Sequence, residues 1–228
     1  MSNLKRNGLR RWAPSYLRNQ GKVTKAQKRA LREWWNEFGL RFEYNKTLDL
    51  NAAFPIDGPL VIEIGFGKGD HLIELAQSFP EHRFLGIEVH RPGLAHATAL
   101  AKEHDCRNVR LLRGDARLIL TDHLEPEIAS AVMIQFPDPW PKPGDRHRRL
   151  LQPGMLDTLY RTLRSGGELL LVTDVEDYAQ DSERNLQEAE GWERQISSPW
   201  FDHRIETLYE SKAREAGRAI HEIAYRRR

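Results

Sequence analysis

The sequence contains a single cysteine, Cys106, among its 228 residues. One cysteine excludes an internal disulfide and any metal site that needs two thiolate ligands. Long hydrophobic runs are also missing. The longest apolar stretch, residues 128–134, includes a serine, whereas a membrane-spanning helix needs about 20 residues. No apolar stretch follows the basic N-terminal residues, so no secretory signal is visible. We therefore expect a cytoplasmic protein with no membrane partner.

Acidic residues are missing from the first 32 positions. Residues 1–32 carry ten Lys or Arg and no Asp or Glu, and because the whole chain has a net charge of +2, the remainder carries −8. A basic segment on an acidic body points electrostatically to a polyanionic partner. The alternative is a solvated tail without a partner, and the charge pattern leaves both open.

Short apolar runs alternate with helical patterns from Leu60 onward. This order is typical of an α/β fold, with a mostly parallel sheet covered by helices on both faces. Strands are predicted at residues 60–64, 84–89, 109–113, 131–136 and 168–173, with a closing strand near 219–225. Helices are predicted at residues 72–79, 92–104, 116–123, 149–163 and 176–189.

The region before Leu60 has a different character. Thr24 and Gln27 fit a capping box, which predicts a helix over about residues 24–38. Residues 45–59 contain two prolines and a glycine and indicate a linker. We therefore divide the chain into a basic extension with one helix (1–45), a linker (46–59) and an α/β domain (60–228).

A glycine-rich loop, residues 63–69 (Glu-Ile-Gly-Phe-Gly-Lys-Gly), includes the end of the first predicted strand. Glycines here allow a tight turn and close approach of a ligand. Glu88 ends the second strand, where an acid binds ribose hydroxyls in nucleotide folds. Asp70 occupies the third glycine position of the dinucleotide pattern, which disfavours a pyrophosphate at the helix start. The pattern favours S-adenosylmethionine, which carries no phosphate, with Glu63 holding its amino group. A ligand-free turn is the alternative.

Asp115 follows the third predicted strand. It lies on the same face as the glycine loop, where it could accept from an adenine amino group. A Gly-Asp pair at a strand end is more often a turn and a helix cap.

The most unusual segment, residues 136–142 (Phe-Pro-Asp-Pro-Trp-Pro-Lys), follows the fourth predicted strand. Ligands of open parallel sheets bind beyond the carboxyl ends of the strands. Prolines on both sides of Asp138 restrict its backbone, and Trp140 offers a face on which a base can stack. Positive charge follows at Lys142, Arg146, Arg148 and Arg149. The alternative is a stiffened connection with a buried tryptophan and a solvated charge run.

Other catalytic classes lack the residues they need. The chain has no Gly-x-Ser-x-Gly elbow, and residues 67–69 lack the Ser or Thr of a P-loop. The nine histidines are scattered, so no metal site is expected. Cys106 lies in a polar turn away from the predicted strand ends, which disfavours a pyrimidine C5 methyltransferase, because that class needs a cysteine nucleophile beside its cofactor.

These motifs together resemble the bacterial tRNA (guanine-N7-)-methyltransferases over nearly the whole chain. The resemblance implies a class I S-adenosylmethionine-dependent methyltransferase of Rossmann-like fold that acts on guanine 46 in the tRNA variable loop. The segments that carry it are residues 18–27 (Arg-Asn-Gln-Gly-Lys-Val-Thr-Lys-Ala-Gln), 63–67, 86–90 (Gly-Ile-Glu-Val-His), 136–140 with Lys142, and Thr173-Asp174.

The resemblance also implies roles for individual residues. Leu208 departs from the family pattern, which usually has Lys or Arg between the threonine and the following aromatic residue. Asp138 is implied to be catalytic. The implied cofactor residues are the carboxylates Glu63, Glu88, Asp115 and Asp138 and the loop glycines Gly65 and Gly67. The implied substrate contacts are Lys142, Asp174, Thr207 and Glu210, and the implied RNA contacts are Arg146, His147, Arg148 and Arg149.

The implied chemistry needs no strong base. Guanine N7 has a lone pair and no proton, and methylation gives the ring a positive charge that a carboxylate such as Asp138 can stabilise. The expected partner is tRNA, with no obligatory protein partner and a monomer or homodimer. Two alternatives stay open: another class I methyltransferase acting on an amino group or a small molecule, and a non-catalytic RNA-binding module.

Overall fold

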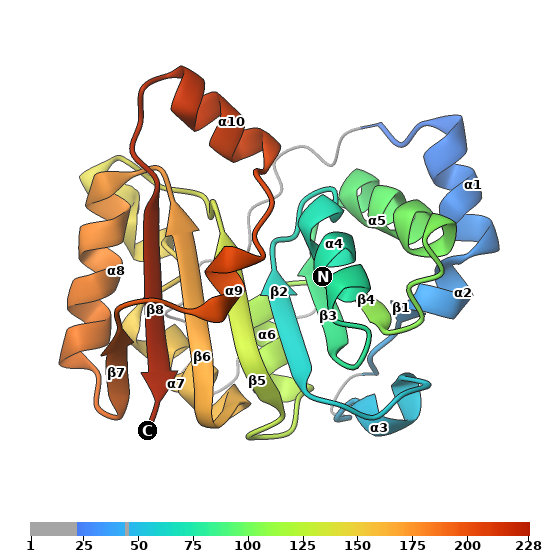
Figure 1. Ribbon diagram of the computed structural model, residues 1–228, viewed down its shortest axis with the longest axis horizontal. Helices are drawn as coiled ribbons and strands as arrows, with labels where there is room; N and C mark the ends of the chain where they lie inside the picture. Colours follow the sequence, from blue (N-terminus) through green and yellow to red (C-terminus); the bar gives the residue numbers. More distant parts are fainter. Residues whose placement is uncertain (1–21, 44–45) are drawn as a thin grey trace, which may run out of the picture.

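The computed structural model describes residues 22–43 and 46–228, and the sequence predictions for residues 1–21 lie outside this range. The described residues form one eight-stranded sheet in the order β1-β4-β3-β2-β5-β6-β8-β7 (Figure 1). The strands are β1 (Gly39–Leu40), β2 (Leu60–Ile64), β3 (Arg83–Glu88), β4 (Val109–Arg113), β5 (Ala129–Gln135), β6 (Leu163–Thr173), β7 (Trp192–Gln195) and β8 (His221–Arg227).

The sheet is parallel from β1 to β6, and only β8 pairs antiparallel, with β6 on one side and β7 on the other. The predicted Rossmann-like α/β class is therefore confirmed. Since the six parallel strands point the same way, their carboxyl ends meet at one edge of the sheet, where ligands of such folds bind.

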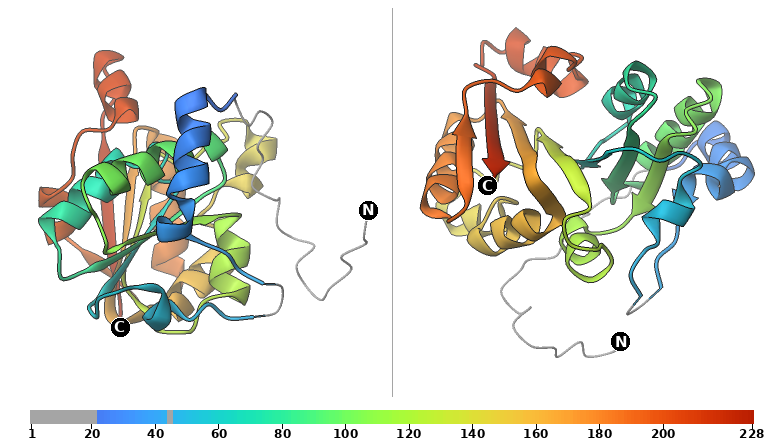
Figure 2. Two further views of the ribbon diagram at one scale, coloured as in Figure 1. Left: turned by 90° about the vertical axis from the view of Figure 1, so that its right-hand side faces the viewer. Right: turned by 60° about the horizontal axis from the view of Figure 1, so that its bottom comes forward.

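Helices cover both faces of the sheet (Figure 2). The helical elements are α1 (Lys25–Glu33), α2 (Trp35–Phe38), α3 (Leu50–Ala53), α4 (Asp70–Ser78), α5 (Arg91–Glu103), α6 (Ala116–Asp122), the 3-10 helix η2 (Pro143–Arg148), α7 (Pro153–Thr162), α8 (Glu176–Glu188), α9 (Pro199–Asp202) and α10 (Leu208–Glu215). None of those within residues 22–43 and 46–228 is long and apolar enough to cross a membrane.

The alternation of strand side chains builds two core layers. In β2, Leu60 and Ile62 pack in the layer that includes α3, α6, α7 and α8, while Val61 packs in the layer that includes α2, α4 and α5. Each fully buried Leu, Ile or Val contributes about 1.5–3 kcal/mol relative to an exposed one. Glu63 shares the side of Val61, so a carboxylate enters the interior just where β2 ends.

The predicted helix over residues 24–38 is interrupted. The capping box is present as predicted, with the Gln27 amide 3.2 Å from Thr24 Oγ1, but Trp34 leaves helical geometry and separates α1 from α2. This change of direction buries Phe38 in the core and lets Gly39–Leu40 pair with β4. The extension thus supplies an edge strand, which the sequence pattern did not predict.

The predicted linker is also more ordered than expected. Asp49 caps α3 by accepting from the Ala52 amide at 2.9 Å, and Leu50 and Phe54 enter the core. Farther along the chain, α7 begins at Pro153 and not near residue 149, because Pro favours the first helical turn and Arg149 is held elsewhere. The domain boundaries at residues 45 and 59 stay a prediction.

Candidate active site

A cavity of about 810 Å³ lies beyond the carboxyl ends of β2, β3 and β5. Its walls come from the glycine loop after β2, the end of β3, the start of α5, residues 134–140 and residues 205–209. The α10 helix projects above this edge of the sheet (Figure 2). The predicted cofactor loop and the predicted Asp138 loop therefore face the same space.

The glycine loop is open toward the cavity. Gly65 and Gly67 have φ angles of 73° and 60°, the left-handed region that favours glycine. A Cβ built on either residue would meet no atom within 4 Å, whereas a Cβ on Gly93 of α5 would lie 2.0 Å from the Gly67 carbonyl oxygen. The loop backbone is thus supported by α5 from one side and left bare on the other, where a ligand can approach it.

Glu88 holds the same loop. Its carboxylate accepts from the backbone amides of Gly67 (3.0 Å), Val89 (2.6 Å) and His90 (2.8 Å), and the residue is 8% exposed. Three amide donors fix one carboxylate firmly. Glu88 therefore lines the cavity, and it also ties the glycine loop to the end of β3.

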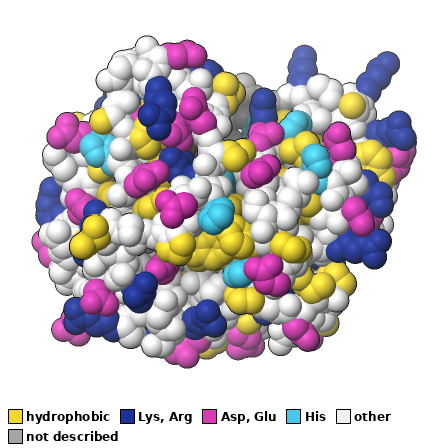
Figure 3. All heavy atoms as spheres, viewed as in Figure 1, with side chains coloured by type: hydrophobic (Ala, Val, Ile, Leu, Met, Phe, Trp, Pro, Cys, Tyr) yellow, Lys and Arg dark blue, Asp and Glu magenta, His cyan; other side chains and the backbone are white. Residues whose placement is uncertain are grey.

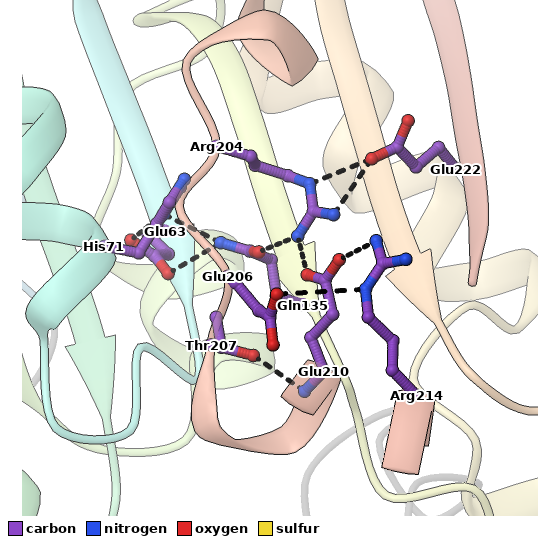
Figure 4. Close-up of polar contacts among 9 residues, drawn as sticks. All are labelled: Glu63, His71, Gln135, Arg204, Glu206, Thr207, Glu210, Arg214 and Glu222. Carbon is purple, nitrogen blue, oxygen red and sulfur yellow. Dashed lines mark hydrogen bonds and ion pairs between the residues drawn. The ribbon is translucent and has the colours of Figure 1, made fainter. Parts of the chain in front are cut away.

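Glu63 belongs to a buried polar cluster. Glu63 Oε2 lies 3.2 Å from His71 Nδ1, and Gln135 Nε2 lies 3.3 Å from Glu63 Oε1 and 2.7 Å from His71 Nδ1. The hydrogen-bond network extends from Gln135 to Arg204, whose Nη1 donates to Gln135 Oε1 at 3.1 Å (Figure 4). The sequence interpretation missed His71, Gln135 and Arg204. One signal was available for Gln135, a polar residue within the otherwise apolar strand predicted at residues 131–136.

The Asp138 loop is held in a strained conformation. Phe136 and Trp140, at its two ends, have φ angles of 47° and 43°, and each non-glycine residue in this region costs about 1–2 kcal/mol. The Phe136 amide donates to the Val172 carbonyl at 2.8 Å, and the Phe136 ring stacks on Tyr209 with centroids 6.3 Å apart. Between these ends Asp138 is exposed and lines the cavity.

The basic run after the loop separates into surface and interior residues. Lys142 and His147 are exposed, Arg146 pairs with Asp177 at 3.0 Å, and the Arg148 guanidinium lies 4.7 Å from the centre of a Trp140 ring. Arg146, His147 and Arg148 remain candidates for RNA contact, and Lys142 remains a candidate for substrate contact.

Arg149 is different, and the prediction that it contacts RNA is wrong. Its residue exposure is 2%, and its guanidinium binds the carboxylates of Asp177 and Asp181. Its Nε also donates to the Pro139 carbonyl at 3.0 Å. Arg149 therefore fixes the Asp138 loop to α8 from inside the molecule.

Thr207 and Glu210, at the start of α10, have different surroundings. Thr207 lines the cavity, and its side chain caps α10 by accepting from the Glu210 amide at 3.2 Å. Glu210 is buried between Arg204 (2.8 Å) and Arg214 (2.7 Å), and it does not line the cavity. Burial acts to raise the pKa of Glu210, but the two guanidinium groups outweigh it, so the pKa lies below its ordinary value. Leu208 is exposed beside Thr207.

Asp174 and Asp115 make local contacts. Asp174 pairs with Arg218 at 2.7 Å. Asp115 caps α6 by accepting from the Arg117 amide at 2.9 Å, between the cavity residues Gly114 and Ala116. The side chain of Asp115 therefore caps α6, the alternative that the sequence left open, and Asp115 itself is not among the residues that line the cavity.

The single cysteine does not line the cavity. Cys106 is buried in the turn after α5, and burial raises the pKa of its thiol to about 11, which makes a poor nucleophile. Within residues 22–43 and 46–228, no group of three or more His, Cys, Asp or Glu side chains is placed to hold a metal ion.

Comparison with known proteins gives concordant matches. The family model Methyltransf_4, described as "Putative methyltransferase", matches residues 57–223. A tRNA (guanine-N(7)-)-methyltransferase of Nitrosococcus oceani is 35% identical over 93% of this chain and 90% of its own length. The enzyme of that name from Alkalilimnicola ehrlichii is 38% identical over 94% of this chain and 92% of its own.

Solved structures agree on the fold. The 16S rRNA methyltransferase KamB aligns with a TM-score of 0.56 and 16% identity, covering 82% of this chain and 95% of that one. At this identity the likeness shows a shared class I methyltransferase fold and nothing of the substrate.

Proposed function

The chain belongs to the tRNA (guanine-N7-)-methyltransferase family, and on this basis we propose that it transfers the methyl group of S-adenosylmethionine to N7 of a guanine in tRNA. We further propose guanine 46 of the variable loop as the target. The observation that carries the proposal is a single cavity with a bare glycine loop on one side and an exposed, proline-flanked Asp138 on another.

The residues around the cavity fit S-adenosylmethionine. The bare backbone at Gly65 and Gly67 leaves room for a ligand that side chains would fill. The nearby carboxylates of Glu63 and Glu88 suit a cation and ribose hydroxyls and would repel a phosphate. We propose that Glu63 holds the amino group and Glu88 the ribose, with Asp115 beside the adenine. When bound, the cofactor supplies an electrophilic methyl group on a sulfonium.

Asp138 acts on the guanine. The N7 lone pair needs no base, so the task of the protein is to orient the ring and stabilise the positive charge that it gains. A carboxylate held by Pro137 and Pro139 meets that charge without reorganising, and a fixed loop keeps the reacting atoms in line. We propose that Thr207 contacts the guanine side of the cavity, while Glu210 and Asp174 hold the surrounding segments.

Basic side chains lie on two segments that reach the cavity, through Arg148 on one and Gln27 on the other. Lys142, Arg146, His147 and Arg148 follow the Asp138 loop, and α1 carries exposed Lys25, Lys28, Arg29 and Arg32. The Lys and Arg side chains over α1 are visible at the upper right of Figure 3. Gln27 of α1 lines the cavity and donates to the Pro92 carbonyl at 3.3 Å, which anchors this basic helix at the rim. We propose that the tRNA backbone lies across both groups.

Incubating unmodified tRNA with the protein and labelled S-adenosylmethionine tests the proposed activity. Nucleoside mass spectrometry is expected to find 7-methylguanosine, and chain cleavage at the modified base is expected to map it to position 46. A guanine-to-adenine change at that position is the control. Label in another nucleoside would refute the N7 assignment, and label at another guanine would refute only the position.

Substituting Glu88 with alanine is expected to weaken S-adenosylmethionine binding by about 1–3 kcal/mol, since hydrogen bonds to a charged acceptor are lost. The effect has two sources: contact with the ribose, and release of the Gly67 amide that Glu88 now holds. Calorimetry measures the affinity. Glu81→Ala removes an exposed carboxylate that, within residues 22–43 and 46–228, pairs with neighbouring His82, and it is the matched control. Equal affinities for both variants would remove Glu88 from the cofactor site.

Deleting residues 1–22 is expected to weaken tRNA binding and spare cofactor binding. The deletion removes six Lys or Arg. If about three of them contact phosphates, the log–log salt dependence of tRNA affinity becomes shallower by roughly two to three, at about 0.7–0.9 per contact. Filter binding at several salt concentrations measures the slope. An unchanged slope would mean that the segment is a passive tail, with the methyltransferase assignment unaffected.

A further inference from the structure

Arg204 joins the two sides of the cavity. Its side chain is 8% exposed and lies between Glu210 Oε2 (2.8 Å) and Glu222 Oε1 (2.9 Å). The same guanidinium donates to Gln135 Oε1 at 3.1 Å (Figure 4). One residue of the α9–α10 connection is therefore fixed by two carboxylates and reaches back to the end of β5.

The contact with Arg204 determines how the Gln135 amide is turned. A guanidinium has only donors, so the atom of Gln135 that faces it must be the carbonyl oxygen. The amide nitrogen then points the other way, to within 2.7 Å of His71 Nδ1 and 3.3 Å of Glu63 Oε1. Both of its hydrogens are used on the cofactor side of the network.

The turned amide in turn determines the state of His71. With the Gln135 amide turned this way, its nitrogen donates to Nδ1 at 2.7 Å, and in a neutral imidazole that accepts at Nδ1 the ring proton lies on Nε2. Nε2 is buried and has no hydrogen-bond partner among the described residues. Glu63 Oε2 lies 3.2 Å from Nδ1 but receives no proton from it.

We propose that Arg204 and Gln135 are positioning residues that hold His71 in the Nε2–H tautomer and so leave Glu63 Oε2 without a donor from His71, available to a cationic group of the cofactor. The inference rests on the proposed function, in which Glu63 binds the amino group of S-adenosylmethionine. If His71 donated from Nδ1, it would use one lone pair of Glu63 Oε2 and weaken that oxygen as an acceptor for the ligand. The same arginine binds the carboxylate of Glu210, whose backbone amide donates to the Thr207 side chain. Arg204 therefore contacts both the network that sets the His71 tautomer and the segment on the guanine side of the cavity.

The tautomer is directly observable. In protein labelled with ¹⁵N in histidine, the unprotonated ring nitrogen resonates well downfield of the protonated one, and long-range proton couplings tell Nδ1 from Nε2. Comparison with His71→Asn assigns the signals. At neutral pH the full chain is expected to show an unprotonated Nδ1 at His71, and a protonated Nδ1 would overturn the proposal.

Gln135→Leu removes the donor that faces Nδ1. The ring is then expected to shift its proton to Nδ1 and donate to Glu63, and the dissociation constant for S-adenosylmethionine is expected to rise about tenfold, the size of one hydrogen bond to a charged group. Gln77→Leu is the matched control, because Gln77 Nε2 faces His104 Nδ1 at 3.3 Å on the exposed surface. The control should change neither the His71 spectrum nor the affinity.

Arg204→Gln tests the more distant link. It frees the Gln135 amide to turn over, so His71 is expected to show the Nδ1–H signal although its own partner is intact, while Arg204→Lys retains a donor and should restore the native tautomer. If Gln135→Leu or Arg204→Gln weakens binding with an unchanged His71 spectrum, their role is only structural and the proposal fails. Failure of the unaltered chain to bind S-adenosylmethionine would refute the proposed function, while the tautomer measurement would still decide this inference.

Discussion

Replacing Asp138 with alanine is expected to slow methyl transfer in a single turnover by about 100- to 1,000-fold, the usual cost of losing one preorganised electrostatic partner. The affinity for S-adenosylmethionine is expected to stay within about threefold. The reason is geometric: Asp138 is exposed at the mouth of the cavity, whereas Glu63 and Glu88 lie at the buried strand ends. Rapid mixing with saturating cofactor and tRNA measures the rate without product release.

Two variants separate charge from loop structure. Asp138→Asn keeps the shape of the side chain and removes its charge, so it should lose most of the rate that Asp138→Ala loses. Asp145→Ala removes a carboxylate from η2 that pairs with Arg148 at 3.6 Å and does not line the cavity, and it should retain a rate near that of the native chain. A rate for Asp138→Ala within about threefold of native would show that another group stabilises the developing charge.

Local sequence patterns were sufficient for the central sheet. The apolar runs at β2, β3, β4, β5 and β6 are each buried on both faces, and such runs predict interior parallel strands wherever they occur. The elements that were missed are short and decided by distant contacts. Gly39–Leu40 becomes a strand only because β4 offers an open edge, and the break at Trp34 reflects the burial of Phe38.

The candidate site divides in the same way. Glu63 and Glu88 lie at the ends of β2 and β3, and Asp138 follows the end of β5; since the parallel strands end at one edge, sequence alone places them around one cavity. The cluster of His71, Gln135 and Arg204 joins three segments that lie far apart along the chain. No spacing rule relates such residues, so only the folded chain brings them together.

Arg149 shows how a charge run can mislead. Four neighbouring residues carry basic side chains, and composition cannot tell which of them turns inward. The partners of Arg149, Asp177 and Asp181, belong to α8, at a sequence distance that the pattern of the run does not reveal. Arg149 is buried because its guanidinium binds both the Pro139 carbonyl and the two carboxylates of α8, and these contacts hold the Asp138 loop against α8.

Substituting Arg149 with methionine is therefore expected to destabilise the protein. The change leaves Asp177 and Asp181 without their buried partner, at a cost of about 3 kcal/mol in the free energy of unfolding, the low end for a broken buried pair because Asp177 is 41% exposed. For a chain of this size the melting temperature should fall by roughly 6–12 °C. The rate of methyl transfer should also fall, since the Pro139 carbonyl loses its donor next to Asp138.

The control for Arg149→Met is Arg146→Met, which removes a 40% exposed arginine from the same Asp177 carboxylate. An exposed pair contributes about 0–1 kcal/mol, so this variant should melt near the native temperature, and equal melting of the two variants would contradict the burial argument.

The pH dependence of the unfolding free energy gives a second check. The hydrogen bond from Arg149 holds the pKa of Asp177 below its ordinary 3.8. A lowered pKa stabilises the fold above the unfolded value, and this stabilisation is lost as the pH falls through the folded one. The difference in unfolding free energy between native and Arg149→Met is thus expected to be full at neutral pH and to shrink below about pH 4. A difference that stays constant under acid would show that packing around the guanidinium, and not its charge, anchors the Asp138 loop.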